Sequence, residues 1–142
     1  MTSEEGDISD ALLPICLFIK IALLSSPVMS NPIFKLNGRI WIETGDEKIL
    51  GHGRVELLER IQASGSIRQA ALQMKMSYKQ AWDLVNHMNE HFGQPLVISH
   101  RGGKGGGNAV VTEHGLKVIG EFHLLHQKFQ EFLTANSINL PL

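Results

Sequence analysis

Apolar side chains recur three and four residues apart in three successive segments of the middle of the chain, a spacing typical of amphipathic helices. The first predicted helix, residues 54–63, ends at Ser64-Gly65, because a glycine tolerates the left-handed backbone that often follows a helix. Ser66 and Ser77 can each cap the helix that follows, since a serine hydroxyl accepts a hydrogen bond from an amide of the first turn. The pattern therefore predicts two capped helices joined by a tight turn at Lys75-Met76.

One short hairpin is predicted before these helices and a second one after them. The first joins residues 40–43 to residues 48–50, and turn-forming residues lie between the two strands. The second joins residues 96–99 to residues 109–111 through a loop with five glycines. Pro95 ends the preceding helix, because proline cannot continue it.

The last segment completes the predicted fold. Thr112 can cap a final helix over residues 113–133. The order helix, helix, helix, hairpin, helix predicts a mainly α fold with a small amount of β structure, namely a winged helix-turn-helix with a long C-terminal dimerisation helix. The recognition helix would begin near Ser77, and the wing would be residues 101–107. An αα-hairpin in a helical bundle has the same two capped helices, but the hairpin directly after them favours the winged helix.

The final helix carries a second apolar pattern. Five of its residues follow the 4-3-4-3 spacing of a coiled-coil seam: Val118, Phe122, Leu125, Phe129 and Phe132. One small domain cannot easily cover so broad an apolar face, so we expect this seam to form a homodimer contact. The alternative is that the helix packs on residues 1–50 of its own chain.

The first 28 residues differ from the rest. An apolar run over residues 11–24 is too short for a membrane-spanning helix. The residues before it are acidic, whereas a signal peptide needs positive charge there. We interpret residues 1–28 as an N-terminal extension, with Met29 as the alternative start, and residues 29–142 as the winged-helix domain. A helix that packs on this domain or on a partner is the alternative for the extension.

Charge is distributed unevenly along the chain. The formal net charge of the 142 residues is −1, which by itself gives no sign of a nucleic-acid partner. Residues 66–105, however, hold five cations and only two anions. The single cysteine, Cys16, excludes an internal disulfide and a cysteine-based zinc site. We therefore expect a cytoplasmic protein with no membrane partner and a local basic surface.

The exposed positions of the second capped helix carry the candidate base contacts. The Gln80 amide can pair with adenine, and Lys79 can reach a guanine edge or a phosphate. Asp83 can accept from cytosine or orient Lys79 one turn away. The predicted DNA-binding residues lie at the two helix starts and in the wing: Ser66, Arg68, Ser77, Tyr78, Lys79, Gln80, Asp83, Arg101 and Lys104. For each of them the alternative is a solvated surface side chain.

The wing combines cations with glycines. Arg101 and Lys104 lie among five glycines with no acidic residue, and glycine lets the backbone approach a phosphate closely. A flexible hairpin tip is the alternative interpretation. A nucleotide-binding P-loop is excluded, because Gly105 stands where that motif needs serine or threonine.

Seven histidines raise the question of a metal site. His87 and His91 are four residues apart, and His123 and His126 are three apart, so either pair can supply two ligands. No cysteine is near for a third ligand, and we expect solvated surface histidines, no metal and no cofactor. No arrangement typical of catalysis stands out, so we do not expect an enzyme.

A set of short runs carries a family resemblance: Gly65–Ala71, Met76–Asp83, Met88-Asn89, Pro95–Val97, Gly102–Ala109, Val111-Thr112 and Gly115. These runs closely resemble the N-terminal DNA-binding domain of ModE-type molybdate-responsive regulators, which is related to the LysR-type winged helix. The resemblance covers about residues 36–132. It implies a dimeric repressor or activator of molybdate-uptake or molybdoenzyme genes. Full-length members sense molybdate in C-terminal domains, which we expect this chain to lack because it ends at Leu142.

The leading prediction is therefore a sequence-specific regulator that binds double-stranded DNA as a homodimer, with no small-molecule effector evident. The alternative is a winged helix used as a protein-interaction module without a specific DNA target. A third hypothesis is a sensor that holds a metal or an oxyanion at the dimer contact. An exposed polar face on the recognition helix would favour DNA, and an apolar one would favour a protein partner.

Overall fold

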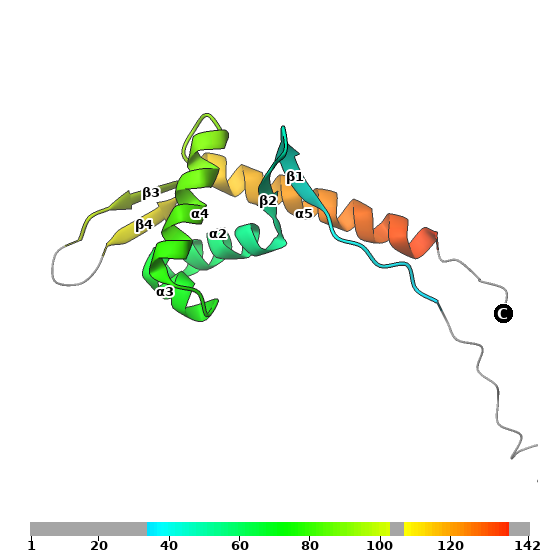
Figure 1. The fold of residues 1–142 in the computed structure, drawn as a ribbon, viewed down its shortest axis with the longest axis horizontal. Coiled ribbons are helices and arrows are strands. Elements are labelled where there is room, and N and C mark those ends of the chain that lie inside the picture. Colours follow the sequence, from blue (N-terminus) through cyan, green and yellow to red (C-terminus); the bar gives the residue numbers. More distant parts are fainter. Residues whose placement is uncertain (1–33, 103–106, 137–142) are drawn as a thin grey trace, which may run out of the picture. The chain divides into compact units, whose positions relative to one another are not determined.

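The computed structural model describes residues 34–102 and 107–136, which belong to one unit, Phe34–Leu142 (Figure 1). Its elements follow in the order β1 (Trp41–Thr44), β2 (Glu47–Gly51), α2 (His52–Ser64), α3 (Ile67–Gln73), α4 (Tyr78–His91), β3 (Val97–His100), β4 (Asn108–Val111) and α5 (Glu113–Ala135). This order confirms the predicted winged helix-turn-helix fold. The predicted extension, residues 1–28, and Lys104 of the wing lie outside the described residues.

Three helices begin at the predicted caps. The Gln69 backbone N–H donates to Ser66 Oγ (3.3 Å), and the Gln80 backbone N–H donates to Ser77 Oγ (3.1 Å). In the same way the Gly115 N–H donates to Thr112 Oγ1 (3.0 Å). Each cap satisfies an amide that has no partner within its helix, which explains why α3, α4 and α5 begin where they do.

The core forms around α2, which contacts α3, β4 and α5, while α3 contacts α4. Four apolar side chains of α2 are buried: Val55, Leu57, Leu58 and Ile61. Ala70, Ala71 and Ala81 are also buried, and their small side chains let α3 and α4 pack closely. The turn between these two helices contains Lys75 with a left-handed backbone (φ +55°), a conformation that a lysine rarely adopts.

Each hairpin forms its own two-stranded antiparallel sheet. In the first, Thr44 pairs with Glu47 across a turn in which Gly45 has a φ of +59°. In the second, Val97 pairs with Val111 and His100 pairs with Asn108. The β3–β4 hairpin extends away from the helices, as the wing of this fold does (Figure 1).

The structure assigns the apolar face of α5 differently from the seam predicted by heptad spacing. Phe122 is only 1% exposed and belongs to the core of its own domain, so its place in an intermolecular seam was wrong. Phe129 packs against the segment that precedes β1: a Cβ added to Gly38 would lie 2.7 Å from the Phe129 ring. Leu125 and Phe132 are 45% and 57% exposed. The chain's own residues therefore cover part of the predicted seam and leave another part open.

None of the helices in residues 34–102 and 107–136, α5 included, is both long enough and apolar enough to cross a membrane.

Candidate nucleic-acid interface

The first turn of α4 presents its side chains to solvent. Ser77, Tyr78, Lys79 and Gln80 are all exposed, while the helix buries Ala81, Val85 and Met88 on its other face. Tyr78, one of the predicted DNA-binding residues, is 54% exposed, and its ring stacks on that of Trp82 with 6.4 Å between the centroids. The polar start of α4 is therefore free to contact a partner.

Lys79 and Asp83 form an ion pair on the exposed face of α4. Lys79 Nζ lies 2.7 Å from Asp83 Oδ2, and their side chains are 85% and 57% exposed. This ion pair is the contact of one of the two roles considered for Asp83, the orientation of Lys79. Solvent screens such a pair, so it contributes little to stability and leaves Lys79 able to turn toward a phosphate.

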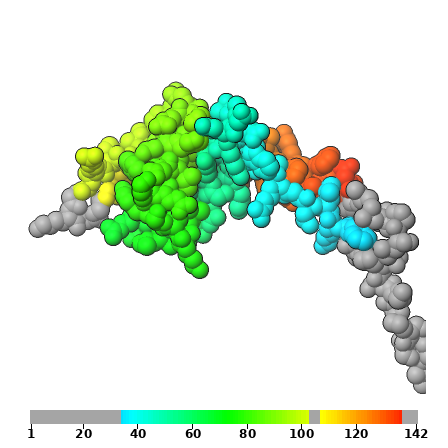
Figure 2. Space-filling model, viewed as in Figure 1, coloured from blue at the N-terminus to red at the C-terminus, as the bar shows by residue number. Residues whose placement is uncertain are grey.

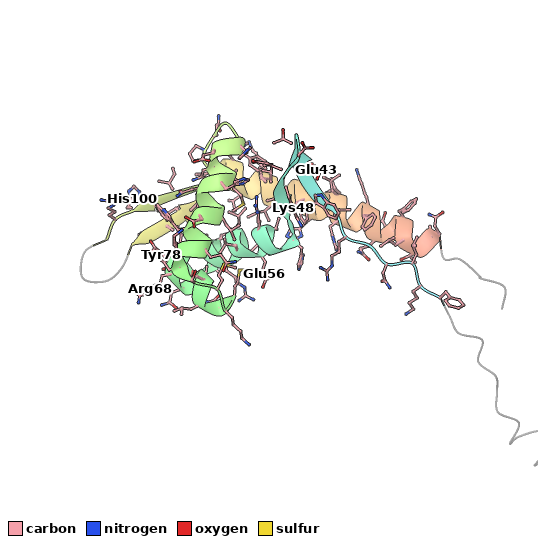
Figure 3. All side chains as sticks on the ribbon, in the orientation of Figure 1. Glu43, Lys48, Glu56, Arg68, Tyr78 and His100 are labelled. Atoms are coloured by element: carbon pink, nitrogen blue, oxygen red, sulfur yellow. The ribbon has the colours of Figure 1, made fainter. Side chains whose placement is uncertain are left out.

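A groove of about 760 Å³ lies between the N-termini of α3 and α4 and the outer end of the wing strands, where β3 ends and β4 begins. Figure 3 labels three of the residues that line it, Arg68, Tyr78 and His100, on the side from which the wing extends. Figure 2 shows α3 and α4 in green beside the wing in yellow. The described lining residues include Arg68 and Arg101 and no carboxylate, so the groove favours an anionic partner.

Backbone and side-chain hydrogen bonds fix the wing beside this groove. The Ala109 N–H donates to the carbonyl of Gly65, the residue that ends α2 with a φ of +67° (2.9 Å). Asn89 on α4 bonds to the backbone of Leu96 and Val97. Thr112 Oγ1 donates to the Pro95 carbonyl (2.8 Å). The wing is thus held to α2, α4 and α5.

The predicted contact residues separate into two groups. Ser66, Arg68, Tyr78 and Arg101 line the groove together. Lys79, Gln80 and Asp83 are exposed on α4 and do not line the groove, and Ser77 serves as the helix cap. Together the two groups cover the starts of α3 and α4 and the segment that follows β3.

Sequence reasoning missed several groove residues, among them Trp82, His100 and Asn108. The pairing of His100 with Asn108 places both at the outer end of the wing strands. His100 and Asn108 flank the glycine-rich loop, and this position was the signal that could have identified them. The prediction treated both residues only as part of the loop.

A second polar cluster lies around the other end of α4. His87 and His91 both approach Glu47 at the start of β2, and Arg54 donates to His87 Nδ1 (3.1 Å). His91 is exposed and His87 is partly buried, and both have polar partners that the sequence did not predict. Burial lowers the pKa of Arg54, and the nearby Glu47 carboxylate opposes that shift.

Residues 53–116 match a family described as "Bacterial regulatory helix-turn-helix protein, lysR family". The match extends from the second residue of α2 to the first turn of α5, and so includes α3, α4 and the wing.

Three curated relatives share this region. The "Molybdenum transport protein ModE" of Azotobacter vinelandii is 35% identical over 102 residues, which cover 72% of this chain and 38% of the relative. The "Molybdenum-pterin-binding protein MopA" of Rhodobacter capsulatus is 49% identical over 76 residues, covering 54% of this chain and 29% of the relative. The "DNA-binding transcriptional dual regulator ModE" of Escherichia coli is 47% identical over 74 residues, covering 52% and 28%. The chain thus spans between about a quarter and two fifths of the length of these relatives.

Proposed function

We propose that this chain, which carries the winged helix-turn-helix domain of ModE-type regulators, is a transcription regulator that binds double-stranded DNA at specific sequences. The observation that carries the proposal is the joint placement of the exposed polar start of α4 and the anchored wing on either side of a groove that contains Arg68 and Arg101. A helix that enters the major groove uses its first turns to contact bases, and a wing contacts the adjacent backbone.

Each side chain has a role in this proposal. Gln80, exposed and next to the cap, reads a base edge through its amide. Lys79 leaves its ion pair with Asp83 when DNA binds and contacts a guanine edge or a phosphate instead. Arg68 and Arg101 contact phosphates from opposite walls of the groove, and these contacts position the protein without reading sequence. Lys104, which lies outside the described residues, extends the same role to the tip of the wing.

We further propose that the regulated genes are related to molybdenum. The support is the similarity to proteins whose names refer to molybdenum transport and molybdenum-pterin binding. The role assigned to this chain is DNA binding in the cytoplasm, without catalysis and without a small-molecule effector.

The proposed DNA-binding unit is a homodimer. Val118, Leu125 and Phe132 recur every seven residues along α5, and Leu125 and Phe132 are left exposed in the single chain. Residues at this interval lie on one side of a helix, so a second copy can cover them in a coiled-coil-like contact.

Selection of binding sites from random DNA tests this function. The wild type should enrich a defined sequence, and Gln80→Ala should relax preference at one position, since a good bidentate base contact is worth about 1–3 kcal/mol of discrimination. Gln62→Ala, an exposed glutamine on α2, is the matched control and should select the wild-type sequence. If no sequence is enriched at any salt concentration, specific DNA binding is excluded.

A protein-interaction module without a specific DNA target is the second candidate. Ile98 and Val110 pair across the wing strands and are 45% and 53% exposed, which is the observation that favours it. The same selection separates the two functions, because a module of this kind enriches no DNA sequence. A charged variant, Val110→Lys, should leave DNA selection unchanged if the wing contacts DNA only through its cations.

A further inference from the structure

We infer that Glu47, His87 and His91 form a binding site for a divalent transition-metal ion such as Zn²⁺, held within a single chain and separate from the proposed DNA interface. The three residues come from two elements: Glu47 begins β2, and the two histidines lie one turn apart near the end of α4. Their potential ligand atoms all lie within 4.8 Å of one another.

Two of the three distances between ligand atoms match tetrahedral coordination. Zn²⁺ binds nitrogen and oxygen ligands at about 2.0–2.1 Å, so two ligand atoms of a regular tetrahedron are separated by about 3.3 Å. His87 Nε2 lies 3.2 Å from Glu47 Oε2, and His91 Nε2 lies 3.3 Å from the same oxygen. The third distance, between the two imidazoles, is at most 4.8 Å, so the rings have to approach each other for all three groups to bind one ion.

The orientation of His91 is an independent observation that points to a cation. Its Nδ1 lies 2.8 Å from the His87 carbonyl, which can only accept a hydrogen bond, so Nδ1 carries the proton. In the neutral ring Nε2 then presents a lone pair to Glu47 Oε2, which is itself an acceptor. A positive charge between the two atoms, supplied either by a proton on Nε2 or by a metal ion, makes this contact favourable. A backbone carbonyl that fixes the tautomer in this way is a common feature around metal-bound histidines.

His87 needs one rearrangement. Arg54 Nη1 donates to His87 Nδ1 (3.1 Å), which places the ring proton on Nε2. When a metal takes Nε2, that proton has to move to Nδ1, and Arg54 keeps only its bond to the Ile49 carbonyl (2.6 Å). Arg54 therefore competes with the metal for the His87 ring.

The donor set selects the class of ion. Two imidazoles and one carboxylate suit a borderline cation such as Zn²⁺ rather than Ca²⁺ or Mg²⁺, which prefer oxygen ligands. The Glu47 side chain is 63% exposed, so solvent can reach the site and provide the fourth ligand. A bound ion would join the β1–β2 hairpin to the last turns of α4, and it would stabilise the folded state because the unfolded chain does not hold the three ligands together.

Titration of untagged, full-length protein with ZnCl2 tests this site, with stoichiometry and affinity measured by calorimetry. We expect one Zn²⁺ per chain and a rise in the midpoint of thermal unfolding that EDTA reverses. Loss of a residue outside the ligand shell typically weakens metal affinity by at least about tenfold. Glu47→Gln and His91→Gln change ligands themselves, so each should weaken the zinc affinity by more than this. His123→Gln is the matched control: His123 lies 2.6 Å from Glu59, an exposed pair for which residues 34–102 and 107–136 offer no third ligand, and its loss should not alter zinc binding.

Two further measurements make the inference falsifiable. Arg54→Gln should tighten zinc binding, since the amide oxygen can accept a hydrogen bond from the protonated Nδ1 of His87, and this gain cannot come from a failure to fold. Co²⁺ should give the intense visible absorption of tetrahedral coordination in the wild type and not in Glu47→Gln. The inference is overturned if the wild type binds no zinc, if Glu47→Gln and His91→Gln bind it as the wild type does, or if the stoichiometry is one ion per two chains.

Discussion

Asn89 on α4 forms two hydrogen bonds with the backbone of Val97 in β3. Its Oδ1 accepts the Val97 N–H at 3.1 Å, and its Nδ2 donates to the Val97 carbonyl at 2.8 Å. The same oxygen accepts the Leu96 N–H at 2.8 Å. Since Leu96 and Val97 are buried, water cannot easily replace these bonds. One side chain therefore fixes where the wing begins relative to the helix that we propose to read DNA.

Asn89→Ala should destabilise the domain. It removes the acceptor of two buried backbone amides, and leaving a buried donor unsatisfied costs about 1–3 kcal/mol. We expect the midpoint of urea unfolding to fall by a corresponding amount, while DNA affinity falls in the folded fraction because the wing loses its orientation. Asn86→Ala, the same change on the same helix outside these bonds, is the control. Equal unfolding midpoints for the two variants would contradict the proposed role of Asn89.

Two glycines of α5 should respond in opposite ways to alanine. A Cβ on Gly115 would lie 2.5 Å from the Leu96 carbonyl oxygen and 2.7 Å from Val111 Cγ1, and the backbone atom cannot move without disturbing the wing. Gly115→Ala should therefore lower the free energy of unfolding by about 1–3 kcal/mol or more. A Cβ on Gly120 meets nothing within 4 Å, so Gly120→Ala should raise it by about 0.5–1 kcal/mol. Urea unfolding of the two variants gives the comparison, and stabilisation by Gly115→Ala would refute the predicted clash.

The helix starts and the order of elements were predictable because local chemistry determines them. Ser66, Ser77 and Thr112 are followed by apolar residues at helical spacing, and each forms the capping bond that its position predicts. The glycine-rich loop and Pro95 placed the second hairpin for the same reason. These signals need only a few neighbouring residues.

Features that depend on distant parts of the chain were not predictable in this way. Heptad spacing identified Phe122 as apolar, but it does not show whether the chain's own core or a second copy covers that face. The contact of Glu47 with His87 joins residues 40 positions apart, and only the packing of the first hairpin against α4 brings them together. The left-handed backbone of Lys75 also had no signal, because glycine and asparagine are the residues usual there.

A double charge substitution tests the dimer contact on the residues that the structure leaves open. Leu125→Glu with Phe132→Glu should convert a dimer to a monomer, since burying two unpaired carboxylates against their symmetry mates is costly. Both side chains are exposed in the single chain, at 45% and 57%, so the fold should persist. Sedimentation measures the change.

Leu124→Glu is the matched control for this experiment. Leu124 is also 45% exposed, but as the neighbour of Leu125 it points about 100° away around the helix. It should leave the oligomeric state unchanged. If the double variant stays dimeric, or if Leu124→Glu dissociates the dimer equally, the contact lies elsewhere. Phe122→Glu is unsuitable as a test, because it would place a charge in the core and unfold the domain.

The salt dependence of DNA binding separates the residues that position the protein from those that read sequence. Arg101 lines the groove just beyond the outer end of β3 and is exposed, so Arg101→Ala should leave folding stability nearly unchanged. Its loss should weaken binding to specific and random DNA alike, because phosphate contacts carry little sequence information. The slope of log affinity against log salt should become shallower by about one unit per chain, since one fewer counterion is displaced.

Lys117→Ala removes a cation from α5, away from the groove, and should keep the wild-type slope. Gln80→Ala should likewise keep the slope while changing the preferred sequence. If Arg101→Ala and the wild type have identical slopes, the part of the wing around Arg101 does not contact DNA. That result would favour the exposed Ile98–Val110 pair as a protein-binding surface instead.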